Sequence, residues 1–193
     1  KDLKHPASYP VSLCEKLIKT FSKDGAAVLD PFNGTGSSLV AAHNLNRPAT
    51  GIDLSEEFCE IARKRVRDDN NIRIINDDIK NIDTSDMFAG TMADVIIGGP
   101  PCQGFSMAGA RIRQGFIDDP RNYLFKHYFN VVKTVMPKVF VMENVKGIST
   151  MQGGKIFEEI KRIFQDPEAL NGKPYHIYHR VINAADFGVP QRR

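Results

Sequence analysis

The fold of this chain is decided by the stretch AAVLDPFNGTGS, residues 26–37. It begins as a short apolar strand over Ala26–Asp30, passes through a glycine-rich turn and opens a helix that runs to about Asn46. Two glycines let the backbone come close to a ligand, and free amides at a helix start favour a carboxylate or phosphate. A plain tight strand-to-helix turn is the alternative interpretation of the same residues.

Strands and helices alternate along the rest of the chain. Further strands are predicted at 49–53, 72–75, 94–98 and 139–142, and a sixth extended segment at Tyr175–Asn183. Apolar stripes at helical spacing predict helices before the first strand, after Ser55, over 124–135 and over 156–164. Short apolar strands alternating with helices predict an α/β fold, a mostly parallel sheet with helices on both faces, as one domain over residues 1–193.

Composition excludes several classes of protein. No apolar run is long enough to cross a bilayer. The 3 cysteines are widely spaced, which argues against a disulfide framework or a zinc site and favours a reducing, cytoplasmic location. The net charge of +3 permits nucleic-acid binding without demanding it.

Polar groups follow each predicted strand. Strand one ends in Asp30, strand two in Asp53, strand three runs into Asp77 and Asp78, and strand five into Glu143. Because ligands of parallel sheets bind at the carboxyl ends of the strands, these groups should meet at one edge. Asp53 has the spacing of an acid that holds ribose hydroxyls. Leu39 stands where dinucleotide enzymes prefer a third glycine, so adenosine with an amino-acid tail suits the site better than a pyrophosphate.

The glycine turn resembles the cofactor motif of S-adenosylmethionine-dependent methyltransferases with a Rossmann-like fold. The resemblance implies that Phe32 lies against the adenine, that Gly34 and Gly36 flank the methionine part, and that Asp53 binds the ribose. Asp77 could replace Asp78 at the adenine-contacting position. The complete predicted cofactor set is Asp30, Phe32, Gly34, Gly36, Asp53, Asp78, Ile79 and Pro101, with S-adenosylhomocysteine as the product.

A second motif, GGPPCQGFS at 98–106, follows strand four. A cysteine taken alone is most often a buried small hydrophobe. Here two prolines fix the backbone, and the string resembles the nucleophile motif of DNA cytosine carbon-5 methyltransferases. The segments MENV at 142–145, AADFGVPQRR at 184–193 and DPRNYLF at 119–125 resemble further motifs of that family, in the expected order.

This resemblance implies covalent catalysis on a cytosine flipped out of double-stranded DNA. Cys102 would add to carbon 6, Glu143 would contact ring nitrogen 3 and the exocyclic amine, and Arg193 would favour the thiolate. No metal is implied. Contacts to DNA are expected from a loop after the cysteine and from the strand-five motif; the residues are Gln103, Ser106, Arg111, Arg113, Arg121 and Asn144. For each loop arginine, an ordinary solvated position is an equal alternative.

Two departures from the family pattern stand out. The opening HPASYP and the DPFNGTG string are more similar to enzymes that methylate exocyclic amines, which place an acid, Asn or Ser before Pro-Pro. Gly99 and Cys102 disfavour that activity. The helix before strand one takes the place of a helix that the usual carbon-5 enzyme has at its C-terminus, which suggests a circular permutation. The second motif arginine, the last sheet strand and the target-recognition domain are missing, so a partner chain or a further segment is expected to supply them.

Two other functions remain open. RNA-modifying relatives tend to carry a Cys-Phe-Thr segment, which is absent here, and a non-enzymatic role in binding cofactor or a partner is the third possibility. The DNA methylating enzyme is the leading interpretation, in a bacterial cytoplasm, associated with the nucleoid, with a restriction-modification role.

Overall fold

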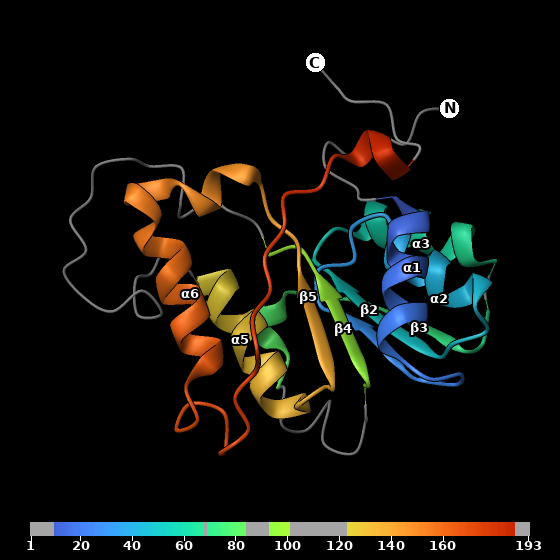
Figure 1. Cartoon of the computed structure of the whole chain (residues 1–193). Helices are drawn as coiled ribbons and strands as arrows, with labels where there is room; N and C mark the ends of the chain where they lie inside the picture. Colours follow the sequence, from blue (N-terminus) through green and yellow to red (C-terminus); the bar gives the residue numbers. More distant parts are fainter. Residues whose placement is uncertain (1–9, 68, 84–92, 101–122, 188–193) are drawn as a thin grey trace.

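The computed structural model describes residues 10–67, 69–83, 93–100 and 123–187. At its centre lies a parallel sheet in the order β3-β2-β1-β4-β5 (Figure 1). The strands are β1 (Val28–Asp30), β2 (Ala49–Asp53), β3 (Ile72–Asn76), β4 (Val95–Gly98) and β5 (Val139–Met142). The first begins at Val28 rather than Ala26. This topology confirms the predicted α/β, Rossmann-like fold, with all five carboxyl ends at one edge.

Helices cover both faces of the sheet (Figure 1). On one face lie α1 (Val11–Phe21), α2 (Ser37–Asn44) and α3 (Glu56–Val66), and on the other α5 (Tyr123–Val135) and α6 (Lys155–Gln165). Four short 3-10 turns complete the described elements: η1 (Ile79–Asn81), η4 (Lys146–Ser149), η5 (Met151–Gly154) and η6 (Ala184–Phe187). Among the described residues, no helix combines the length and the apolar character needed to span a bilayer.

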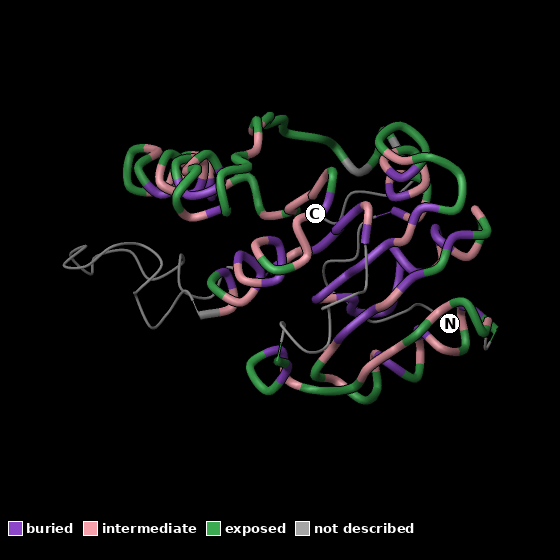
Figure 2. Tube along the Cα trace, turned by 90° about the horizontal axis from the view of Figure 1, so that it is seen from below, coloured by how far each residue is buried: buried purple, intermediate pink, exposed green. Residues whose placement is uncertain are grey.

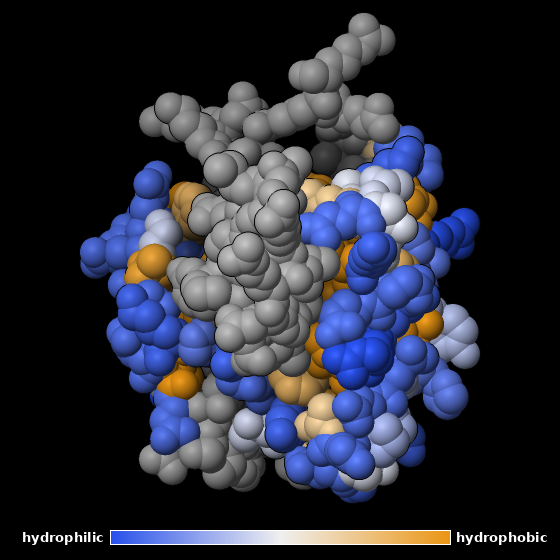
Figure 3. All heavy atoms as spheres, turned by 90° about the vertical axis from the view of Figure 1, so that its left-hand side faces the viewer, coloured by the Kyte–Doolittle hydropathy of each residue, from blue (hydrophilic) through white to orange (hydrophobic). Residues whose placement is uncertain are grey.

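Each helix layer has its own apolar core, and the central strands β1, β2 and β4 are largely buried, whereas the outer strands β3 and β5 are half-buried or exposed (Figure 2). On the first face, α1 contributes Cys14 and Ile18, which are fully buried beside Leu39 of α2. On the second face, Phe164 of α6 stacks at 4.4 Å between ring centroids on Phe140 of β5 and meets the Phe129 ring at 5.4 Å. Polar side chains cover most of the coloured surface on this side (Figure 3).

Local sequence signals explain where α3 begins. The Ser55 side chain accepts a hydrogen bond from the Phe58 amide at 3.3 Å and so caps the helix that was predicted to follow it. Glu56 and Glu57 occupy the first turn, where the helix dipole favours negative charge. The helix ends at Val66, and the following C-cap residue, Arg67, has a left-handed φ of 53°.

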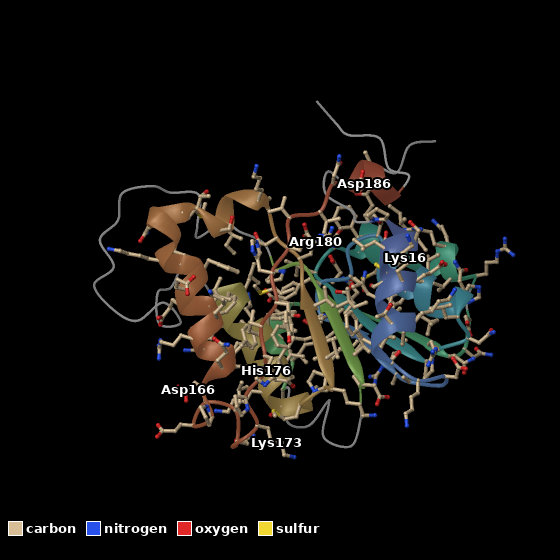
Figure 4. All side chains as sticks on the ribbon, viewed as in Figure 1. Lys16, Asp166, Lys173, His176, Arg180 and Asp186 are labelled. Atoms are coloured by element: carbon tan, nitrogen blue, oxygen red, sulfur yellow. The ribbon has the colours of Figure 1, made fainter. Side chains whose placement is uncertain are left out.

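The segment Tyr175–Asn183 is extended, as predicted, but it forms no strand and leaves β5 paired with β4 alone within the described chain. Tyr175 explains the difference, because its amide donates to the Phe164 carbonyl at 2.9 Å and its hydroxyl to the Pro137 carbonyl at 2.7 Å. These bonds attach the segment to α6 and to the start of β5. It then runs past the helix layer towards the carboxyl end of β5, where Arg180 and Asp186 lie (Figure 4).

Candidate functional site

The turn after β1 is braced from within by Asp30. This carboxylate is fully buried, and its Oδ1 accepts the Phe32 amide at 3.0 Å while its Oδ2 accepts the Ser38 hydroxyl. The first bond orders the turn itself, and the second ties the turn to the first residues of α2. The structure therefore gives Asp30 a bracing role, and direct contact with a cofactor stays a prediction.

Three glycines let the turn pack closely. Gly34 and Gly36 have φ values of 51° and 80°, in the left-handed region that favours glycine. A Cβ on Gly36 would lie 2.8 Å from the Ala62 Cβ, so α3 packs directly on the turn. A Cβ on Gly51 in β2 would reach the Asn33 Oδ1 and lie 2.6 Å from Leu39 Cδ1.

The end of β2 supports the same turn through Asp53. Its Oδ2 accepts the Gly34 amide at 2.8 Å and its Oδ1 accepts the Ser55 amide at 2.9 Å. A carboxylate has about four lone-pair sites, so hydroxyl groups of a ribose can still donate to it. Asp53 thus orders the glycine turn and can still accept hydrogen bonds from ribose hydroxyls, as its predicted role requires.

Asp78, at the end of β3, caps η1. Its side chain accepts the Lys80 amide at 3.0 Å and pairs with the Lys80 ammonium at 2.8 Å, and these bonds lower the pKa of the Asp78 carboxyl. Ile79 is buried behind it. Asp77, the alternative acid, is exposed and bonds the Asn81 amide group at 3.0 Å. Of the two carboxylates, Asp78 lies closer to the core.

These residues fit an adenosine that carries a carboxylate tail. Phe32 is half-buried beside the Tyr128 ring, with a centroid distance of 6.4 Å and a 26° interplanar angle. Gly36 is the N-cap of α2 and has no side chain to cap it, so the first-turn amides are left for an outside acceptor. The Phe32 ring, the Asp53 carboxylate and the start of α2 therefore all belong to or contact this turn, and their contacts with a cofactor stay predictions.

The second part of the site lies where β4 and β5 end. The Glu143 amide donates to the Gly98 carbonyl at 2.9 Å, and Asn144 Nδ2 donates to the Pro100 carbonyl at 3.1 Å. The Glu143 residue keeps an exposed surface, yet partial desolvation of its carboxyl raises its pKa above the ordinary value. The ends of the two motif-bearing strands are thus joined, and a DNA contact for Asn144 stays a prediction.

Eight of the predicted site residues lie outside the described residues. They are Pro101, Cys102, Gln103, Ser106, Arg111, Arg113, Arg121 and Arg193.

Sequence reasoning missed two residues that shape the cofactor turn. Arg65 of α3 donates from Nη1 to the Thr35 carbonyl at 2.7 Å. Tyr128 of α5 is fully buried next to Phe32, and its hydroxyl donates to the Val141 carbonyl at 3.1 Å. Helical spacing placed Tyr128 on an inner face, but no local pattern connects either residue with the turn.

The family model for C-5 cytosine-specific DNA methylases matches residues 28–193. The chain belongs to this family. The match covers both parts of the site described above, and it confirms the family resemblance and S-adenosylmethionine as the cofactor.

Curated relatives agree with this assignment. The Type II methyltransferase M1.HphI of Haemophilus parahaemolyticus is 38% identical over 169 residues, which are 86% of this chain and 43% of that protein. M.AquIA of a Picosynechococcus strain is 37% identical over 187 residues, 93% of this chain and 68% of its own length. M.Bpa9945I of Bacillus paralicheniformis is 47% identical over 106 residues, 53% of this chain and 24% of that protein. The chain thus spans less than half of M1.HphI and about two thirds of M.AquIA.

Proposed function

We propose that the protein transfers a methyl group from S-adenosylmethionine to carbon 5 of a cytosine in DNA, through a covalent bond between Cys102 and carbon 6 of the base. The observation that supports this most directly is the junction of β4 and β5. There, Glu143 and Asn144 contact the residues that immediately precede Pro101 and Cys102. A carboxyl group beside the backbone that leads to a cysteine is the arrangement that such a reaction needs.

The chemistry needs activation because carbon 5 of cytosine is a weak nucleophile. Addition of the Cys102 thiolate to carbon 6 would push electron density to carbon 5. Glu143 would donate a hydrogen bond to ring nitrogen 3 and accept one from the exocyclic amine, and the raised pKa of its carboxyl favours the protonated form that can donate. The bound cofactor would supply an electrophilic methyl group. Loss of the carbon-5 proton, with water as a plausible acceptor, would then expel the cysteine.

Double-stranded DNA is the proposed substrate. The target base must leave the stack, at a cost of about a few kcal/mol, before either motif can reach it. Arg111, Arg113 and Arg121 are proposed to contact phosphates around the opened site. Arg180 is exposed towards the carboxyl end of the sheet (Figure 4), and we propose it as a further phosphate contact.

A target-recognition segment is proposed to lie outside these 193 residues, further along the protein or on a partner chain. The relatives support this, because the chain covers only 43% of M1.HphI. The pairing of β5 supports it as well, since among the described residues β5 pairs with β4 alone, and Val181 and Ile182, which are 53% and 47% exposed, leave apolar surface on the segment that runs past it. Since the relatives are Type II methyltransferases, we also propose a restriction-modification role in association with the nucleoid.

A duplex containing 5-fluorocytosine at the target position tests the covalent step. The full-length protein, together with its recognition segment and S-adenosylmethionine, should form an adduct that survives denaturation, because fluorine cannot leave as a proton would. Cys102→Ser is the control and should form none. An adduct with transfer RNA and not with DNA would support the RNA-modifying alternative. Cofactor binding with no adduct on either nucleic acid would support the non-enzymatic role and refute the proposal.

A further inference from the structure

Two consecutive glycines lie beside the proposed catalytic carboxyl: Gly98 ends β4 and Gly99 follows it. Neither has a φ in the left-handed region, in contrast to Gly34 and Gly36. An L-residue could therefore adopt either backbone conformation. The reason for glycine at these positions must lie in what occupies the space of a side chain.

The two positions have different neighbours. A Cβ on Gly98 would lie 2.9 Å from Tyr128 Cε2 and 3.3 Å from Pro31 Cδ, both parts of rigid, well-packed rings. A Cβ on Gly99 would lie 3.0 Å from Glu143 Oε2, with the next atoms of Glu143 at 3.7 Å and 3.9 Å. Gly98 therefore makes room for the core, and Gly99 makes room for one carboxyl group.

The backbone of Glu143 is anchored on the same side. Its amide is bound to the Gly98 carbonyl at 2.9 Å, and the following residue, Asn144, is bound to the Pro100 carbonyl at 3.1 Å. With the main chain fixed at these two points, a clash at Gly99 can be relieved only by swinging the carboxyl end of Glu143 away. The fold would tolerate that movement, because the end of a glutamate side chain is flexible.

We propose that Gly99 is a positioning residue for the reaction: the absence of a side chain there seats the Glu143 carboxyl at the place where the flipped pyrimidine binds. This inference rests on the proposed function, since it assigns Glu143 the base contact described above. A side chain at position 99 and the carboxyl of Glu143 compete for one place. The space beside Gly99 therefore holds the Glu143 carboxyl, which the end of β5 supplies.

The test compares three glycine-to-alanine variants of the full-length protein. Gly99→Ala should lower kcat up to about tenfold, because a displacement of a few tenths of an ångström misplaces the carboxyl. Its melting temperature and its affinity for S-adenosylhomocysteine should stay close to those of the control Gly147→Ala, whose Cβ would meet nothing within 4 Å. Gly98→Ala should instead lower the melting temperature, because the Tyr128 ring cannot move aside.

A binding measurement separates positioning from a structural role. On a duplex with the target cytosine, Gly99→Ala should bind more weakly than the wild type. The two proteins should bind a duplex with an abasic target equally well, because that duplex offers no base for Glu143 to contact. Equal weakening on both duplexes would show a structural role and overturn the inference. Unchanged kcat in Gly99→Ala, with Glu143→Ala inactive, would overturn it while leaving the proposed function intact. Full activity of Glu143→Ala would show that Glu143 makes no essential contact with the base, and that part of the proposed function would be wrong.

Discussion

Replacing Arg65 by methionine should weaken cofactor binding, although we expect no direct contact between Arg65 and the cofactor. The Arg65 guanidinium is half-buried, and its Nη1 lies 2.7 Å from the Thr35 carbonyl, 3.4 Å from Thr35 Oγ1 and 3.5 Å from Ser37 Oγ. Desolvation lowers the pKa of this guanidinium. Its shortest bond holds the glycine turn against α3 at the start of α2, so Arg65 orders the turn from behind.

The magnitude follows from that shortest bond. A hydrogen bond from a charged donor contributes about 1.5–3 kcal/mol, and Thr35 is buried, so water cannot easily replace the lost partner. We expect the free energy of unfolding to fall by about 2 kcal/mol, which lowers the melting temperature by about 4–8 °C in a domain of this size. The variant's glycine turn is less ordered, and the cofactor must order it when it binds. If this ordering costs about 1.4 kcal/mol of the binding free energy, the Kd for S-adenosylhomocysteine rises about tenfold.

Calorimetric titration with S-adenosylhomocysteine measures the effect, and Arg63→Met is the matched control. Arg63 lies on the same helix and is also half-buried, but its Nη2 donates to the Ile74 carbonyl of β3, at 3.4 Å. Arg63→Met should cost some stability and leave the Kd unchanged. The reasoning is wrong if both variants raise the Kd equally, or if Arg65→Met melts earlier yet binds the product as tightly as the wild type.

Three further predictions concern stability. Burial raises the pKa of the Glu143 carboxyl in the folded protein, so the ionised carboxyl destabilises the fold. Glu143→Gln should therefore raise the melting temperature at pH 7. This gain should vanish in thermal scans at a pH below 4.5, the ordinary pKa of a glutamate. The Lys138 ammonium lowers the pKa of Asp94, so Asp94→Asn should lower the melting temperature at pH 7, with a difference that shrinks as the pH falls through 3.8; a constant difference would contradict this ion pair. Phe164→Ala removes a buried ring that packs on Phe140 and should lower the free energy of unfolding, measured with denaturant, by about 3–5 kcal/mol. A decrease below about 1 kcal/mol would show that the neighbouring side chains move in to fill the cavity.

Much of the fold was predictable because its signals are local. Apolar runs bounded by glycine, proline and aspartate predicted the five paired strands, and Ser55 with two glutamates predicted the start of α3. The row of acids at one edge followed from parallel pairing alone. The sixth extended segment was predicted, but its partners were not, since Tyr175 bonds Phe164 and Pro137, residues that no short-range pattern connects with it.

The amino-acid sequence by itself determined the α/β class, the family, the cofactor and the identity of the residues at the strand ends, because strand and helix periods and short motifs are properties of neighbouring residues. Only the tertiary structure decided that Arg65 and Ala62 support the glycine turn and that Gly99 lies against the Glu143 carboxyl. These contacts join separate elements. Their distances depend on how closely helix and strand backbones pack, and that packing is set by side-chain volumes across the whole core rather than by any local pattern.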